Sequence, residues 1–147
     1  MYSKEQALYI KKEFWIQFAA EYPRKWLLYN TKIKDFSFKF FVDNKKAQVL
    51  LEIEPKEENK RIIYFEKIES LKTIILEDYI TDAIFQRNFH LENGKIVSRI
   101  WIEKEGISIS NKSTWPIIFD FFYNKMDAFE RFFYEYEEYI NDLEINI

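Results

Sequence analysis

The chain has 147 residues, a length that favours a single domain over residues 1–147. It has no cysteine and one histidine, which excludes a disulfide framework, a thiolate nucleophile, a zinc–thiolate site and a multi-histidine metal site. With 22 basic and 25 acidic residues its net charge is −3, so the chain as a whole has no basic field for nucleic acid.

Charged residues interrupt every apolar stretch of the chain. The longest segments without Asp, Glu, Lys or Arg have seven residues, 14–20 and 113–119, whereas a bilayer span needs roughly 18. The first residues predict a helix with acidic side chains rather than the apolar segment of a signal peptide. We therefore expect a cytoplasmic protein that does not enter a membrane.

The two ends of the chain differ in charge. Residues 1–34 carry seven basic and three acidic side chains, whereas residues 113–147 carry two and eight. The basic side chains of the first segment could form a local patch for nucleic acid: Lys4, Lys11, Lys12, Arg24, Lys25, Lys32 and Lys34. Because charge runs usually serve solubility, the interpretation we favour is a solvated face.

Residues 3–23 predict an amphipathic helix. Ser3 and Gln6 form a capping box, and apolar residues then recur at helical spacing until Pro23: Ala7, Ile10, Phe14, Phe18 and Tyr22. The short apolar stretch over residues 24–31 fits either a strand or an irregular packed segment.

Residues 35–54 predict a β-hairpin, because apolar and polar residues alternate on both sides of a polar turn. If Asn44 and Lys45 form the loop, residue i faces residue 89 − i, so Phe36 lies opposite Ile53. A slip of one residue would turn the apolar set to solvent, so the pattern determines this register.

A second helix is expected after Pro55, to about residue 78, and a second hairpin follows it. Asn93 and Gly94 are the strongest turn signal in the chain, because a type I′ turn needs positive φ at both central positions. Residue i then faces residue 187 − i. This pairing predicts one apolar face, formed by Phe85, Phe89, Leu91, Ile96, Ile100 and Ile102, and one polar face, formed by Gln86, Asn88, His90, Val97, Arg99 and Trp101.

The last segment predicts a long C-terminal helix, with Ser113 as its N-cap and Pro116 in its first turn. At 1.5 Å per residue about 30 residues reach roughly 45 Å, longer than the ~38 Å expected across such a domain, so the helix breaks near Asn124 and Lys125 or overhangs. Its apolar residues follow a heptad row: Trp115, Phe119, Phe122, Met126, Phe129, Phe133, Tyr136 and Ile140.

Together these elements predict an α+β domain in the order α-β-β-α-β-β-(β)-α. We expect three helices and a mainly antiparallel sheet of four or five strands. The uncertain strand is residues 107–110, which could extend the preceding strand or form a fifth.

Several short motifs, in order along the chain, are similar to one known family. They are Lys12-Glu13-Phe14-Trp15, Ile33-Lys34-Asp35, Tyr64-Phe65-Glu66, the run over residues 94–100, and Asn111-Lys112 followed by Trp115-Pro116. This set resembles the bacterial family of domain of unknown function 4268 over almost the entire chain. The resemblance implies a small stand-alone protein or a module of larger bacterial proteins, some with nuclease-like domains. It implies no activity and no site residues.

The first hairpin suggests a metal-dependent site. Its register places Asp35 opposite Glu54, with Lys56 two residues further on, and this set resembles the D…[DE]-x-K motif of restriction-endonuclease-like folds. The two carboxylates could hold Mg²⁺ for phosphodiester cleavage, with Glu13 or Glu52 as an added ligand. The interpretation we favour is an ordinary solvated face, on which acidic and lysine residues alternate.

The second hairpin suggests a binding surface. Gln86, His90, Arg99 and Trp101 share its predicted polar face, where they could clamp a base or a peptide. The interpretation we favour is that the C-terminal helix covers this face and buries Trp101, because large exposed apolar patches are unusual on monomers.

The heptad row suggests an assembly surface. A helix that is apolar on two sides must bury both, and the second side could meet another copy of the chain through Phe122, Met126, Phe129, Phe133, Tyr136 and Ile140. The alternative is that both sides are buried in the monomer, between the sheet and the first helix. We therefore predict a non-enzymatic interaction or assembly module without a cofactor, whose partner is itself or another protein. The alternative is a nuclease-like, Mg²⁺-dependent domain or its inactive relative.

Overall fold

The computed structural model describes residues 3–142 of the chain. Its elements are α1 (Lys4–Glu21), β1 (Phe36–Val42), β2 (Lys46–Ile53), α2 (Glu58–Ser70), α3 (Lys72–Ile74), the π-helical turn η1 (Ile75–Tyr79), β3 (Ile84–His90), β4 (Ile96–Glu105), the 3₁₀ turn η2 (Lys112–Thr114) and α4 (Trp115–Asn141). The predicted α+β class is confirmed. The described residues contain four α-helices rather than three. The segment predicted as the second helix is divided into α2, which ends at Ser70, the short helix α3 and the π-helical turn η1.

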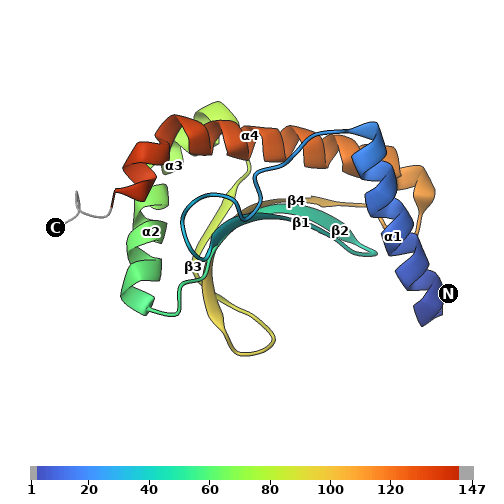
Figure 1. Ribbon diagram of the computed structural model, residues 1–147, viewed down its shortest axis with the longest axis horizontal. Helices are drawn as coiled ribbons and strands as arrows, with labels where there is room; N and C mark the ends of the chain where they lie inside the picture. The colour runs from blue at the N-terminus through green and yellow to red at the C-terminus, as the bar shows by residue number, and fades with distance from the viewer. Residues whose placement is uncertain (1–2, 143–147) are drawn as a thin grey trace.

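The four strands form one antiparallel sheet in the order β1-β2-β4-β3. Residues 107–110 are irregular, so the described residues contain no fifth strand. Figure 1 shows α4 stretched along one face of the curved sheet, with α1 at one end and α2 at the other. The opposite, concave face has no helix of the described chain over it.

The core lies between the sheet and α4 and consists mainly of aromatic rings. Phe14 of α1 is fully buried and packs edge-on against Trp115 and Phe122, with ring centroids 5.2 and 6.1 Å away. Phe40 of β1 lies 4.7 Å from Phe122, which ties α4 to the sheet. Such pairs add packing energy beyond the area they bury.

Helix α1 begins with the predicted capping box. The amide of Gln6 donates to Ser3 Oγ over 3.2 Å, and the amide of Ser3 donates to Gln6 Oε1 over 2.8 Å. The core side of the helix is shorter than predicted, because Ala7 is exposed and burial begins at Ile10. The first turns of α1 therefore lie in solvent.

The first hairpin has the predicted register. Phe36 pairs with Ile53, and every further pair sums to 89. The turn is held by the carboxylate of Asp43, which accepts from the amides of Lys45 and Lys46 over 2.8 Å each. Residues 24–31, left open by the pattern, are irregular.

The register of the second hairpin was predicted wrongly. His90 pairs with Ile96, because the loop has three residues and Gly94 adopts φ +87° as the last of them. The amide of Leu91 donates to Lys95 O over 2.9 Å and closes this loop. A bulge between Gln86 and Phe89 shifts the register again.

The buried side chain of Arg61, in α2, stabilises this bulge of β3. Its guanidinium donates to Arg87 O over 2.5 Å, to Ser98 Oγ over 2.7 Å and to Asn88 Oδ1 over 2.9 Å. The bulge adds a residue to β3 and so changes which face the following side chains use. The predicted apolar face is therefore only partly correct: Phe85, Ile100 and Ile102 pack on the core, whereas Phe89 and Leu91 line the open face and Ile96 is exposed.

Helix α4 is continuous through Asn124 and Lys125, so of the two alternatives the break near these residues does not occur. Its one non-helical residue is Tyr136, close to the C-terminal end. Ser113 is not the N-cap, because a short 3₁₀ turn capped by Asn111 precedes the helix. Pro116 lies in the first turn as predicted.

Candidate functional site

The concave face of the sheet carries a groove of about 590 Å³. Strands β1, β2 and β4 form its floor, and the end of β3 with the following loop forms one wall. Every second residue of β2 and of β4 lines it, on the face opposite the core. The groove is lined by two kinds of residue, charged side chains such as Lys39, Glu52 and Arg99, and apolar ones such as Phe41, Leu50, Phe89 and Trp101.

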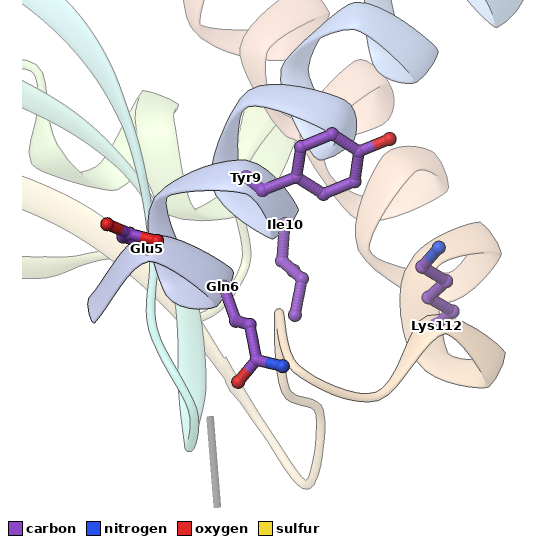
Figure 2. A pocket seen from close by; sticks show the side chains of 5 residues that line it. All are labelled: Glu5, Gln6, Tyr9, Ile10 and Lys112. Atoms are coloured by element: carbon purple, nitrogen blue, oxygen red, sulfur yellow. The ribbon is translucent and has the colours of Figure 1, made fainter. Parts of the chain in front are cut away.

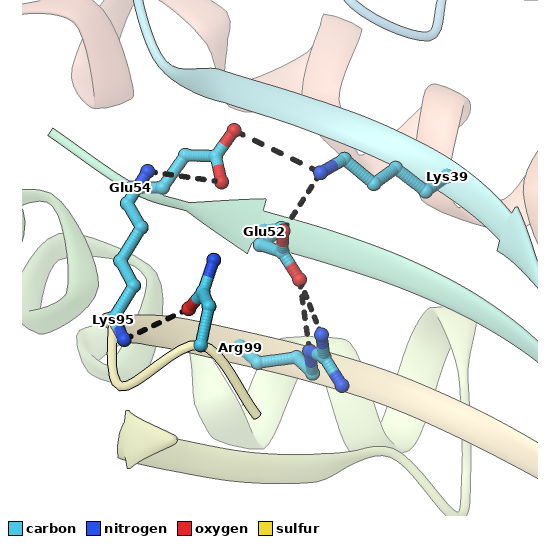
Figure 3. Close-up of polar contacts among 6 residues, drawn as sticks. Lys39, Glu52, Glu54, Lys95 and Arg99 are labelled. Carbon is cyan, nitrogen blue, oxygen red and sulfur yellow. Dashed lines mark hydrogen bonds and ion pairs between the residues drawn. The ribbon is translucent and has the colours of Figure 1, made fainter. Parts of the chain in front are cut away.

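A carboxylate network crosses the groove (Figure 3). Glu52 is only 3% exposed and accepts from Lys39 Nζ over 2.7 Å and from Arg99 Nη2 over 2.5 Å. Glu54 lies beside it, 3.7 Å from Lys39 Nζ and 3.6 Å from Lys95 Nζ. Burial alone would raise the pKa of Glu52, but the hydrogen bonds from Lys39 and Arg99 outweigh it and lower the pKa from its ordinary value of 4.5.

The apolar part of the groove lies next to this network. Lys39, Leu50 and Trp101 follow one another across neighbouring strands in register. The ring of Phe89 packs edge-on against Trp101 at 5.7 Å, and the guanidinium of Arg99 lies 3.9 Å from the centre of the Phe89 ring. Leu50 and Trp101 are thus buried without a helix above them, because their neighbours on the curved sheet cover them.

Trp101 carries an unmade hydrogen bond. Its indole Nε1 is the one buried side-chain nitrogen or oxygen within residues 3–142 that has no hydrogen-bond partner. An unsatisfied buried donor costs about 1–3 kcal/mol, so such groups are uncommon in folded proteins. This donor is buried beneath the groove surface, out of reach of a ligand that binds without moving Trp101.

Comparison with known proteins gives the family of the chain. A family model described as domain of unknown function (DUF4268) matches residues 10–137. The chain belongs to this family. Neither the curated proteins nor the solved structures include a significant match. Membership of the DUF4268 family confirms the resemblance carried by the motifs, and it assigns no activity.

The side chains of the three residues of the predicted metal-dependent site lie in three different settings. Asp35 and Glu54 are adjacent in the backbone, where the Glu54 amide donates to Asp35 O over 2.7 Å. The Asp35 side chain is exposed, however, and the Glu54 carboxylate is occupied by Lys39 and Lys95. Lys56 lines a different pocket, beside the start of α2.

The added ligands do not complete that site. Glu52 is held by Lys39 and Arg99, and Glu13 pairs with Lys112 over 2.6 Å. Over the described part of the chain, no group of three or more histidine, aspartate or glutamate side chains is placed to hold a metal ion. The geometry therefore gives the Mg²⁺ alternative no further support.

Three of the four predicted binding residues line the groove: His90, Arg99 and Trp101. Gln86 lies opposite Arg99 on the same face, and its side chain donates to Asn88 O over 3.2 Å. The expectation that the C-terminal helix covers this face is wrong, because α4 packs on the other side of the sheet. The groove residues that the pattern misplaced are Phe89 and Leu91, since the three-residue loop shifts the register that the pattern assumed.

The residues of the predicted self-association row lie inside the chain. Five of them are buried in the core with at most 1% exposure: Phe122, Met126, Phe129, Phe133 and Ile140. The sixth, Tyr136, is half-buried against the same core. They pack against the chain's own sheet and helices, so this row offers no surface to a second copy.

The basic residues of the N-terminal segment lie in two settings. The six lysines, Lys4, Lys11, Lys12, Lys25, Lys32 and Lys34, are exposed. Arg24 instead pairs with Asp127 over 2.7 Å and with buried Glu130 over 2.9 Å, which fastens residues 24–31 to α4. No helix of the described residues is long and apolar enough to cross a membrane.

Proposed function

We propose that the chain is a non-enzymatic interaction module whose open sheet face binds an extended peptide segment of another protein. The observation that carries this proposal is the groove on the concave face, where exposed apolar side chains lie beside paired charges. Helices of interaction domains often cover one face of a sheet and leave the other for a ligand. Here the open face has room and chemistry for one.

The charges of the groove favour a peptide over a nucleic acid. Lys39 and Arg99 are bound to Glu52, and Lys46 lies 3.6 Å from Glu103. Because each of these cations already has a carboxylate, the groove has no excess positive charge for phosphates, which nucleic-acid binding requires. A peptide can instead offer backbone carbonyls and apolar side chains.

The expected contacts follow from the lining. A large apolar side chain of the peptide would pack on Phe41, which is 40% exposed, and on Leu91. The peptide would lie over the ring of Trp101, which lines the groove while its Nε1 is buried beneath the surface. Aromatic anchors of this kind dominate the energy of protein interfaces.

The proposal is tested by selecting displayed random peptides on the intact chain and measuring their affinity by titration. We expect selected peptides to change the fluorescence of Trp101, an effect that Trp101→Phe removes. Phe41→Ala should weaken binding by about tenfold, since it removes an exposed anchor. Ile117→Ala, at an exposed position on α4, should leave the affinity unchanged.

Two outcomes would contradict the proposal. One is a selection that yields no specific peptide, or peptides that bind Phe41→Ala as well as the unmodified chain. The other is tight, salt-dependent binding of a mixed-sequence single-stranded oligonucleotide to the same face, which would make nucleic acid the ligand.

A further inference from the structure

The exposed side of α1 carries a second surface, separate from the groove. Leu8 and Tyr9 are each 68% exposed and Ile16 is 60% exposed, which places three of the large exposed apolar side chains on one helix. The core side of α1 begins only at Ile10, so the first two turns have no cover from the described chain. Apolar residues in such a position mark an interaction site.

The charges beside these residues make the surface of α1 complementary to the same surface of a second, antiparallel α1. Glu5 and Lys12 are seven residues apart and lie on the same helix side as Leu8 and Tyr9. The midpoint between Glu5 and Lys12 falls between Leu8 and Tyr9. If a second α1 packs antiparallel around that midpoint, Glu5 of each helix lies at the level of Lys12 of the other.

We infer that a second copy of this chain docks on α1 in this antiparallel arrangement. Two Glu5–Lys12 pairs then flank the twofold axis, and Leu8 and Tyr9 of each helix pack against the same residues of the second copy. Glu5 and Lys12 make no hydrogen bond or ion pair within residues 3–142, so both are available for this role. Antiparallel helices also bring opposite ends of their dipoles together.

A pocket beside Tyr9 fits the partner side chain. It has a volume of about 370 Å³ and is lined by Glu5, Gln6, Tyr9, Ile10 and Lys112. Figure 2 shows these side chains, with Lys112 across the opening from the helix. A twofold axis perpendicular to the two helices keeps the same flank of each together, so Tyr9 of the second copy lies on the side of this pocket and can enter it. The contact area is small, and we expect a weak, reversible dimer.

The test is sedimentation equilibrium of the intact chain over a wide range of concentration. We expect a monomer–dimer equilibrium that Leu8→Asp weakens by at least about tenfold. Glu5→Lys and Lys12→Glu should each weaken it about three- to tenfold through like-charge contacts, and the double variant should restore it. Circular dichroism checks that each variant keeps its helices.

Matched controls separate this surface from the rest of the molecule. Lys11→Glu makes the same charge change as Lys12→Glu at the neighbouring exposed position, and it should leave the dimer intact. Phe41→Ala in the groove should also have no effect. A monomer at every concentration, or a double variant as weak as the single ones, would overturn the inference.

Discussion

Replacing Phe122 by alanine is expected to lower the free energy of unfolding by about 3–5 kcal/mol. Phe122 has no exposed surface, and its ring contacts Phe14, Phe18 and Phe40, so it joins α4 to α1 and to the sheet. Truncation would leave a cavity that these rigid rings cannot fill. Urea unfolding followed by circular dichroism measures the change.

The matched control is Ile117→Ala on the same helix. Ile117 is 48% exposed, so its truncation should change the free energy of unfolding by less than about 1 kcal/mol. The experiment also distinguishes a core residue from an interface residue. If Phe122 lay between two copies, the unfolding midpoint would rise with protein concentration in the low micromolar range, and the alanine variant would lose this dependence.

Replacing Glu52 by alanine is expected to lower the free energy of unfolding by about 3 kcal/mol. The substitution leaves Arg99, whose side chain is 14% exposed, without its carboxylate in the floor of the groove. The loss is at the low end of the range for buried ion pairs, because Lys39 is 43% exposed and water can solvate it. Lys46→Ala is the control on the same face: it removes only a half-exposed pair and leaves Glu103 bound to Gln48, so it should cost less than about 1 kcal/mol.

The carboxylate of Glu52 also makes the free energy of unfolding depend on pH in the acidic range. The pKa of Glu52 is lower in the folded chain than its ordinary value of 4.5, so the unfolded chain binds the proton more readily. The contribution of Glu52 is therefore complete above about pH 4.5. It decreases as the pH falls through the folded pKa. Glu52→Ala should flatten the acid side of the stability profile, and a profile parallel to that of the unmodified chain would contradict this assignment.

Local pattern determined the first hairpin and the start of α1. The apolar alternation over residues 36–53 allows one register that buries it, and the short turn at Asn44 and Lys45 permits that register. The capping box at Ser3 likewise depends only on residues three apart. Each of these features involves neighbours in the sequence, so the sequence alone was sufficient.

The candidate site depended on contacts between distant residues. Asn93 and Gly94 suit a two-residue and a three-residue loop alike, since Gly94 provides the positive φ that both require. The loop that forms turns Phe89 to the open face, and a bulge held by Arg61 from another helix shifts the register again. Neither the loop choice nor the bulge has a signature in its own strand.

The sequence by itself determined that this protein is an aromatic-rich α+β domain of the DUF4268 family with a long, doubly apolar C-terminal helix. Only the tertiary structure decided which face of the sheet that helix covers, and therefore that its heptad row is core and that Glu52, Arg99 and Trp101 share an open groove. The physical reason is that periodicity shows how many sides of an element are apolar. The partner that buries each side is decided by the order of the strands and the packing of distant segments.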